Sequence, residues 1–187
     1  MNKKIFIITG PSAVGKTTIA KHVIKLGLPL KKVVTTTTRQ RRKGERDGYN
    51  YHFITRKKFE QLIKDRQMFE WTKYADHYYG SQKRHVEQII KSGKHPLWIT
   101  EVEGAEYFKK RYKKLSVVIF IVPHSFSVLR DRLEKRGAPE ADIRTRLKIS
   151  REELKQSSKF DYRVINYNGK LENVVNEVAE IVKREIN

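Results

Sequence analysis

The sequence contains no cysteine among its 187 residues. Disulfides, thiolate metal sites and cysteine nucleophiles are therefore excluded, and the fold must depend on packing. Long apolar runs are also missing: no window approaches the roughly 20 apolar residues of a membrane-spanning helix, and the run Ile5 to Ile8 is too short for the core of a signal peptide. We therefore expect a cytoplasmic protein with no membrane partner.

Negative charge is scarce in the chain. Its 41 lysines and arginines outnumber 21 aspartates and glutamates, which gives a formal net charge of +20 at pH 7. Such an excess suggests polyanionic partners such as nucleotides, nucleic acid or anionic lipid, and charge alone does not distinguish them. With 38% hydrophobic and 10% aromatic residues, the composition is that of a folded protein. The length suits one sizeable core and hence a single domain.

Short β-branched runs alternate with amphipathic stretches along most of the chain, which predicts an α/β domain with a mainly parallel sheet flanked by helices. One stretch, 35–81, departs from this rhythm because it is rich in arginine and tyrosine, and we expect an inserted subdomain there. The expected strands are Lys4–Thr9, Val33–Thr38, Leu97–Val102, Val117–Val122 and Tyr162–Asn166, and the expected helices lie near 16–27, 82–92, 104–113, 125–136, 140–157 and 171–186.

The most specific motif follows the first expected strand. Residues 10–17 read G-P-S-A-V-G-K-T, which fills every fixed position of the phosphate-loop pattern G-x-x-x-x-G-K-[ST]. Gly10 and Gly15 let successive backbone N–H groups face an anion, beside the positive end of the following helix. Lys16 can reach the β- and γ-phosphates of a nucleoside triphosphate, and the Thr17 hydroxyl can bind Mg²⁺. The motif predicts triphosphate binding but does not name the phosphoryl acceptor.

Beyond this loop, the sequence resembles the guanylate kinase family, ATP-dependent enzymes that phosphorylate GMP to GDP. The resemblance extends from Ile5 to about Glu180, and it implies the P-loop kinase fold with one domain over 1–187. Its implied parts are a core (1–34, 82–125 and 158–187), a GMP-binding insertion (35–81) and a helical lid (126–157). The segments that carry it are Thr37–Phe53, Met68–Trp71, Tyr78–Ser81, Phe120–Ser125, Arg132–Gly137 and Phe160–Asn166.

Residues of the insertion supply the implied GMP site. The resemblance implies that Arg39, Arg42, Tyr51 and Tyr79 hold the GMP phosphate. Two guanidinium groups and two phenol hydroxyls suit a dianionic phosphate, which supports this assignment from the chemistry alone. A solvated basic loop is the alternative reading of residues 39–46.

Glu70, Ser81 and Thr35 match the family positions that contact guanine. A carboxylate accepts hydrogen bonds from the ring N–H and the 2-amino group of guanine, and adenine offers neither donor. Glu70 would therefore discriminate against adenine if it is buried. A surface position for Glu70, beside a core Trp71, is the alternative.

The resemblance also implies a set of residues around ATP. Arg132, Arg136 and Arg146 would act on the charge of the transferring phosphoryl group together with Lys16, and Mg²⁺ would be the cofactor. Arg132 and Arg136 lie four apart and would share one helix face. The implied ATP-binding set is Gly10, Pro11, Ser12, Ala13, Val14, Gly15, Lys16, Thr17, Thr18 and Asn166.

The largest departure from the family pattern is at residues 97–104, where D-x-D-x-x-G is usual. Ile99 stands at the first aspartate and Glu101 at the second, and strand alternation would place both on the face that also carries Glu103. We expect Glu101 to contact the GMP ribose region or to bind Mg²⁺ through water. The departure leaves open a kinase with a weakened or altered acceptor site.

Two other classes of function remain as alternatives. A catalytically weak guanylate-kinase-like binding module is one, although such modules typically damage the phosphate loop, which is complete here. Nucleic-acid binding is the other, suggested by the net charge and by the basic cluster at residues 109–114. With no recognised nucleic-acid motif, we expect that binding to be nonspecific, and the sequence indicates no oligomeric state.

Overall fold

The structure, a computed structural model, describes residues 3–74 and 76–187. The chain divides into two compact units: unit 1 comprises residues up to Leu30 and Leu97–Asn187, and unit 2 comprises Lys31–Pro96. Unit 2 extends beyond the expected insertion 35–81 because helix α3 (Lys83–Lys91) packs on the sheet of that insertion. The first two residues of the expected core lie outside the described part.

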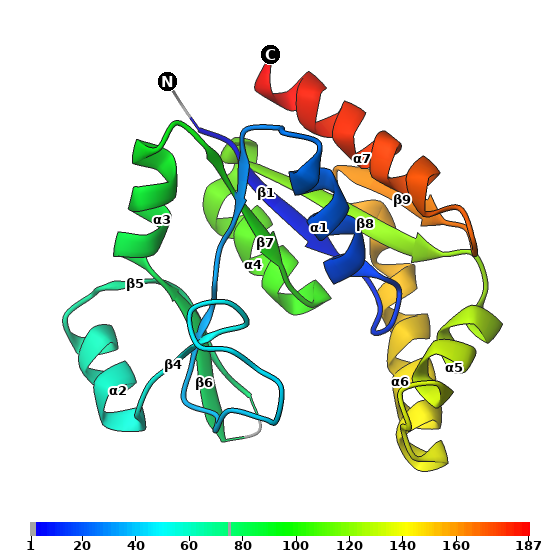
Figure 1. Ribbon diagram of the computed structural model, residues 1–187, viewed down its shortest axis with the longest axis horizontal. Helices are drawn as coiled ribbons and strands as arrows, with labels where there is room; N and C mark the ends of the chain where they lie inside the picture. The colour runs from blue at the N-terminus through cyan, green and yellow to red at the C-terminus, as the bar shows by residue number, and fades with distance from the viewer. Residues whose placement is uncertain (1–2, 75) are drawn as a thin grey trace. The chain divides into compact units, whose positions relative to one another are not determined.

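A five-stranded sheet with the strand order β2-β7-β1-β8-β9 forms the larger framework. Strand β1 pairs in parallel with β7 and β8, and β8 pairs in parallel with β9. Helices α1 and α7 cover one face, and α4 packs against the other (Figure 1). The strands are β1 (Ile5–Thr9), β2 (Leu30–Lys32), β7 (His95–Ile99), β8 (Ser116–Pro123) and β9 (Tyr162–Asn166). The helices of unit 1 are α1 (Lys16–Lys25), α4 (Val102–Tyr112), α5 (Phe126–Glu134), α6 (Glu140–Lys155) and α7 (Leu171–Ile186), with short 3₁₀ turns at Lys113–Leu115 and Ser157–Lys159.

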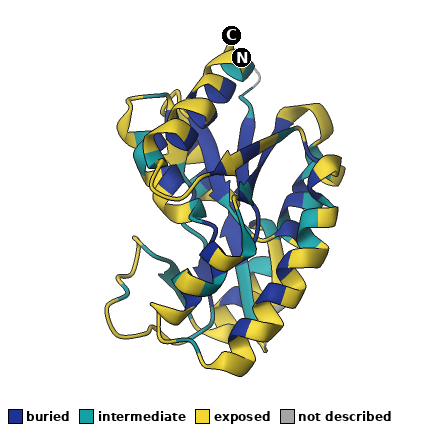
Figure 2. Ribbon diagram, turned by 90° about the vertical axis from the view of Figure 1, so that its right-hand side faces the viewer, coloured by how far each residue is buried: buried dark blue, intermediate teal, exposed yellow. Residues whose placement is uncertain are grey.

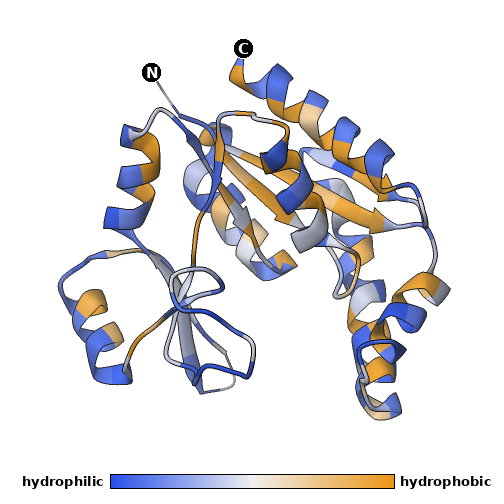
Figure 3. Cartoon of the chain, in the orientation of Figure 1, coloured by the Kyte–Doolittle hydropathy of each residue, from blue (hydrophilic) through white to orange (hydrophobic). Residues whose placement is uncertain are grey.

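Continuous apolar runs explain why the central strands β1 and β8 lie inside. Strand β8 reads S-V-V-I-F-I-V-P, and nearly all of it is buried because helices cover both faces of the sheet. Figure 3 shows the central strands β1 and β8 largely in the hydrophobic colour, and Figure 2 shows the centre of the sheet buried while the helices expose one side. Helix α7 buries Val174, Val178 and Val182, which recur every four residues and form one apolar stripe. The predicted parallel α/β fold is confirmed.

Unit 2 contains a smaller sheet of strand order β4-β3-β6-β5. Strands β5 and β6 form an antiparallel hairpin, and β3 pairs in parallel with β4 and antiparallel with β6. Phe59 of α2 is fully buried and stacks on Tyr78 of β6, with ring centroids 5.2 Å apart. The remaining elements are β3 (Thr36–Thr37), β4 (His52–Phe53), α2 (Arg56–Lys64), β5 (Met68–Tyr74) and β6 (His77–Gln82).

Two strand predictions were wrong in their extent. The expected strand Val33–Thr38 is interrupted, because β2 ends at Lys32 in the five-stranded sheet and β3 begins at Thr36 in the smaller one. The expected strand Leu97–Val102 ends at Ile99, and Glu101 is the N-cap residue of α4. Alternation along a strand therefore does not relate Ile99 to Glu101 and Glu103.

Helix α5 also ends earlier than expected. Its last residue is Glu134, so Arg136 lies outside the helix that carries Arg132, and the two arginines do not share a helix face. Arg130 joins α5 to α6 through paired hydrogen bonds of 3.0 Å to the Glu140 carboxylate. Across residues 3–74 and 76–187, no helix is both long and apolar enough to cross a membrane.

Candidate functional site

The phosphate loop connects β1 to α1, as the motif predicts. Gly10 adopts φ +132°, and a Cβ atom at this position would stand 2.4 Å from the carbonyl oxygen of Ile121. Only glycine fits so close to the neighbouring strand β8. Gly15, at φ +109°, is the N-cap residue of α1, whose first turn contains no acidic side chain. The positive end of α1 therefore stays available for an anion.

Lys16 is held at the loop by three acceptors. Its ammonium donates hydrogen bonds to the carbonyl oxygens of Gly10 at 2.5 Å and Pro11 at 3.2 Å, and to the Glu101 carboxylate at 3.0 Å. Only 10% of the Lys16 side chain is exposed, against 67% of Glu101. A compact charge is thus fixed beside the loop N–H groups, where phosphate charge is best stabilised.

Arg132 and Asn166 hold the phosphate loop through its carbonyl oxygens. The Arg132 guanidinium donates to the carbonyl oxygens of Ala13 at 3.2 Å and Val14 at 3.0 Å, and the Asn166 amide donates to Val14 at 2.7 Å. Asn166 is only 5% exposed. By engaging the loop carbonyls, these two side chains leave the loop N–H groups directed at the anion side.

Arg146 and Arg136 occupy different environments. Arg146 of α6 donates to the Ser12 hydroxyl at 3.1 Å, so α6 also contributes to the phosphate-loop end of the sheet. Arg136 is exposed. Burial, together with the nearby Arg136 charge, lowers the pKa of Arg132. Three cations, Lys16, Arg132 and Arg146, thus contact the loop directly, which is the arrangement expected for a polyphosphate.

Glu153 of α6 is a member of this site that the sequence analysis missed. Partial burial and the neighbouring Glu101 carboxylate raise its pKa to about 7, the Lys16 ammonium acts against them, and Glu103 adds a smaller increase. Glu153 follows Arg146 by seven residues and therefore lies on the same face of the helix, which was a usable sequence signal. Carboxylates from α6 and from the start of α4 thus lie near the charge of Lys16.

This carboxyl group predicts a pH-dependent stability. The folded protein keeps the Glu153 proton up to about pH 7, whereas an unperturbed glutamate loses it near 4.5, so this contribution to stability falls as pH rises between those values. At pH 8, the unfolding free energy of Glu153→Gln should therefore exceed that of the natural protein by about 1 kcal/mol after solvent screening. The two proteins should differ little at pH 5, and urea unfolding at both pH values measures the difference. An equal difference at both pH values would contradict the assigned titration.

In unit 2, two of the three residues matched to guanine contacts, Glu70 and Ser81, lie on one hairpin, and the third, Thr35, immediately precedes β3. Glu70 of β5 lies opposite Ser81 of β6, and the Ser81 hydroxyl donates to the Glu70 carboxylate at 2.8 Å. Ser81 is fully buried and Glu70 is half-buried, so Glu70 is not the surface residue of the alternative reading. Trp71, by contrast, is 46% exposed, so it is not a core residue. Thr35 is half-buried, and its carbonyl oxygen accepts from the His52 N–H at 2.8 Å.

A cationic and phenolic cluster lies near the same sheet. The Arg39 guanidinium lies over the Tyr51 ring at 5.6 Å from its centroid, and the Tyr51 and Tyr79 centroids are 6.1 Å apart. Burial is the main cause that raises the pKa of Tyr51, so its hydroxyl stays protonated and able to donate. Three of the four residues matched to the GMP phosphate are therefore close together.

Glu45 is the second residue that the sequence analysis missed. Its carboxylate accepts from the Arg39 guanidinium at 2.7 Å and from the Arg42 backbone N–H at 2.8 Å. The Arg39 hydrogen bond, followed by that of Arg42, lowers the pKa of Glu45. The available sequence signal was its position in the segment Lys43–Glu45, which directly follows Arg41 and Arg42. Glu45 holds the basic loop in a defined shape.

Each unit gathers its own part of the predicted site. Unit 1 gathers the predicted ATP residues, including the exposed hydroxyl residues Thr17 and Thr18, around the phosphate loop. Unit 2 gathers most of the predicted GMP residues on its small sheet and basic loop. The exception is Glu101, predicted to contact GMP, which belongs to unit 1 and binds Lys16.

Comparison with known proteins gives a consistent result. The family model described as guanylate kinase matches residues 2–185. Guanylate kinases of Onion yellows phytoplasma and Thermotoga maritima are 37% and 39% identical, with 99% of this chain and 88% of each relative covered. A crystal structure of guanylate kinase from Anaplasma phagocytophilum matches with a TM-score of 0.76 and 26% identity over 98% of this chain and 86% of that one. The chain belongs to the guanylate kinase family.

Proposed function

We propose that the chain transfers the γ-phosphoryl group of ATP to the phosphate of GMP. An oxygen of the GMP phosphate attacks the γ-phosphorus, the bond to the bridging oxygen of ADP breaks, and GDP and ADP leave without a covalent enzyme intermediate. This is the activity of the family to which the chain belongs. The observation that carries the proposal is the complete phosphate loop, with the Lys16 ammonium fixed beside it by three acceptors.

The residues of the loop suit Mg²⁺ brought in with ATP. No group of three histidine, aspartate or glutamate side chains that could hold a metal by themselves exists within the described ranges. The exposed Thr17, at the start of α1, offers one hydroxyl ligand, and nucleotide phosphates and water supply the rest of an octahedral shell. When bound, the ion neutralises phosphate charge and orients the triphosphate.

On the ATP side, each cation of this chain is proposed to contact a different part of the triphosphate or of its loop. Lys16 is proposed to leave its carbonyl acceptors and bind the β- and γ-phosphates, because phosphate oxygens attract an ammonium more strongly than neutral carbonyls do. Arg132 keeps the loop in shape through Ala13 and Val14 while lying near the same charge. Arg136 and Arg146 are proposed to act on the transferring phosphoryl group. Asn166 supports the loop and is proposed to lie near adenine.

On the acceptor side, the proposal uses the geometry of unit 2. Glu70 accepts from the ring N–H and the 2-amino group of guanine, while Ser81 and Thr35 contact the base edge. Arg39, Arg42, Tyr51 and Tyr79 bind the phosphate of GMP, and Glu45 keeps Arg39 and the loop around Arg42 in position. Glu101 is proposed to contact the ribose region or a water on Mg²⁺.

A coupled assay of ADP release tests the proposal directly. ATP and Mg²⁺ are supplied with GMP, dGMP, IMP, AMP, CMP or UMP as acceptor. GMP should give the highest kcat/KM, and AMP should be rejected strongly because it leaves the Glu70 carboxylate poorly paired. A different preferred acceptor, or ADP release that does not depend on any acceptor, would overturn the proposed function.

Substitution of Arg136 and of Arg42 should change different kinetic parameters. Arg136→Ala should lower kcat by roughly a hundredfold with little change in the KM for GMP, because its charge is proposed to act in the reacting complex. Arg42→Ala should mainly raise the KM for GMP, by about tenfold or more, because a charged contact to the phosphate is lost. Steady-state kinetics with GMP varied at saturating ATP measure both effects. Identical defects in the two variants would contradict this division of roles.

A further inference from the structure

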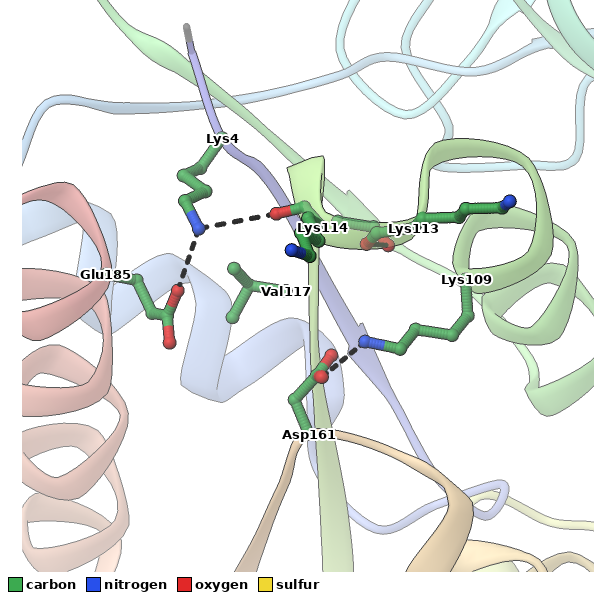
Figure 4. A pocket seen from close by; sticks show the side chains of 8 residues that line it. Lys4, Lys109, Lys113, Lys114, Val117, Asp161 and Glu185 are labelled. Carbon is green, nitrogen blue, oxygen red and sulfur yellow. Dashed lines mark hydrogen bonds and ion pairs between the residues drawn. The ribbon is translucent and has the colours of Figure 1, made fainter.

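A lysine-lined pocket opens at the end of the sheet away from the phosphate loop. Its volume is about 490 Å³, and its lining comes from unit 1 alone. Lys4 immediately precedes β1, whereas the phosphate loop follows the last residue of that strand, so the two sites are separated by the strand's length of about 15 Å. The lining residues are Lys4, Lys109, Lys113, Lys114, Ser116, Val117, Asp161 and Glu185 (Figure 4).

Both carboxylates of this pocket already have ion-pair and hydrogen-bond partners. Glu185 accepts from the Lys4 ammonium at 3.2 Å and from the Tyr162 hydroxyl at 2.5 Å. Asp161 pairs with Lys109 and also accepts from the Val118 N–H at 2.9 Å. Each carboxylate therefore neutralises one of the four lysines, and the charges of Lys113 and Lys114 remain in excess. In Figure 4 no dashed line reaches these two ammonium groups, and within the described residues neither has an ion-pair partner.

The turn that carries the two lysines is fixed before any ligand arrives. The Ser116 hydroxyl donates to the Lys113 carbonyl at 2.8 Å, and the Lys4 ammonium donates to the Lys114 carbonyl at 3.3 Å. Lys113 adopts φ +40° and ψ −115°, a backbone conformation that favours glycine and strains a lysine. Strain of this kind concentrates at ligand sites, where a particular side chain is needed despite its conformational cost.

We infer that this pocket is a second anion site, for a ligand that carries two or more phosphate groups. Its volume falls in the range of about 300–1,000 Å³ typical of small-molecule sites. Ammonium groups suit phosphates as point charges, and two unneutralised lysines match two phosphate charges. Val117, which lies between the two ion pairs in Figure 4, is buried in the hydrophobic core, so the lysines supply the ligand contacts.

The test uses the intact protein with its phosphate loop saturated by Mg²⁺ and a non-hydrolysable ATP analogue. Inorganic tripolyphosphate and a short single-stranded oligonucleotide are then titrated separately, and the amide NMR signals of Ser116 and Val118 are followed. Tighter binding of tripolyphosphate identifies a free phosphorylated ligand, and tighter binding of the oligonucleotide identifies a nucleic-acid backbone as the source. No saturable shift with either probe overturns the inference.

Variants separate a built site from general attraction to a basic protein. Lys113→Gln with Lys114→Gln should weaken binding about tenfold or more, whereas Lys57→Gln with Lys58→Gln, an exposed adjacent pair on α2, removes equal charge and should change it less than twofold. Lys113→Gly removes one charge and relieves the backbone strain, so it keeps the test valid if the double variant is unstable. Equal weakening in both double variants overturns the inference.

Kinase activity separates this inference from the proposed function. The Lys113 and Lys114 variants should keep kcat and KM for GMP within about twofold, because the pocket lies at the opposite end of β1 from the phosphate loop. A tenfold loss of kcat in these folded variants would show that the pocket belongs to the catalytic site, and it would overturn the claim of a separate site. Failure of the GMP assay itself would leave the binding result standing.

Discussion

Lys16→Ala is expected to lower kcat by at least about a hundredfold at saturating ATP and GMP. The Lys16 ammonium donates to the phosphate-loop carbonyls of both Gly10 and Pro11, so its charge is held directly at the loop. No neutral group of the loop replaces its effect on β- and γ-phosphate charge, and single electrostatic contacts of this kind typically account for about 2.7–4 kcal/mol of transition-state stabilisation. The measurement is steady-state ADP release, with nucleotide concentrations raised until each rate saturates.

The control for this variant is the stability of the fold. Lys16 is nearly buried in the nucleotide-free protein, so its removal leaves two carbonyls and Glu101 without this donor and should cost about 1–2 kcal/mol in unfolding free energy. Lys21→Ala, on the exposed side of the same helix, should change neither activity nor stability appreciably. A folded Lys16→Ala protein with nearly natural kcat would remove the phosphate loop from the proposed mechanism.

The parallel core was predictable because its signal is local. Strands β1 and β8 are short runs rich in β-branched residues, and α7 places its valines at intervals of four, so the local sequence pattern reveals these elements. The phosphate loop was predictable for a similar reason, since Gly10 and Gly15 are required by backbone geometry that only a few sequences satisfy. The same reasoning failed at Val33–Thr38, where one β-branched run is divided between two sheets by tertiary pairing.

Electrostatic partners across elements were the part that sequence did not reveal. Glu101 binds Lys16, which lies 85 positions earlier, and Glu153 acquires its raised pKa from burial and from charges on other elements. The seven-residue spacing from Arg146 places Glu153 on the site face of α6, whereas Glu152 forms an exposed ion pair with Lys155, but this spacing does not reveal the burial or the charged neighbours that raise the Glu153 pKa. Long-range contacts of this kind depend on the folded arrangement, so they become visible only in three dimensions.

Ile99→Asp is expected to raise kcat/KM for GMP by about ten- to a hundredfold. Ile99 ends β7 at the position where the family usually carries an aspartate, and an apolar side chain there accepts no hydrogen bond from the nucleotide and orients no water on Mg²⁺. A well-aligned carboxylate contact contributes about 1.5–3 kcal/mol, which corresponds to that range. The measurement is the kinetic comparison of both proteins with GMP as the varied acceptor.

The gain must be separated from the cost of changing a packed side chain. Ile99 is half-buried against the hydrophobic core, so the aspartate variant should lose about 1–2 kcal/mol of stability. Ile99→Asn is the matched control, because it loses the same apolar contacts without adding a carboxylate, and it should not gain activity. If the natural protein is efficient with GMP and Ile99→Asp lowers that efficiency more than Ile99→Asn does, Ile99 belongs to a rearranged pocket. The nature of the acceptor must then be decided again from the nucleotide panel.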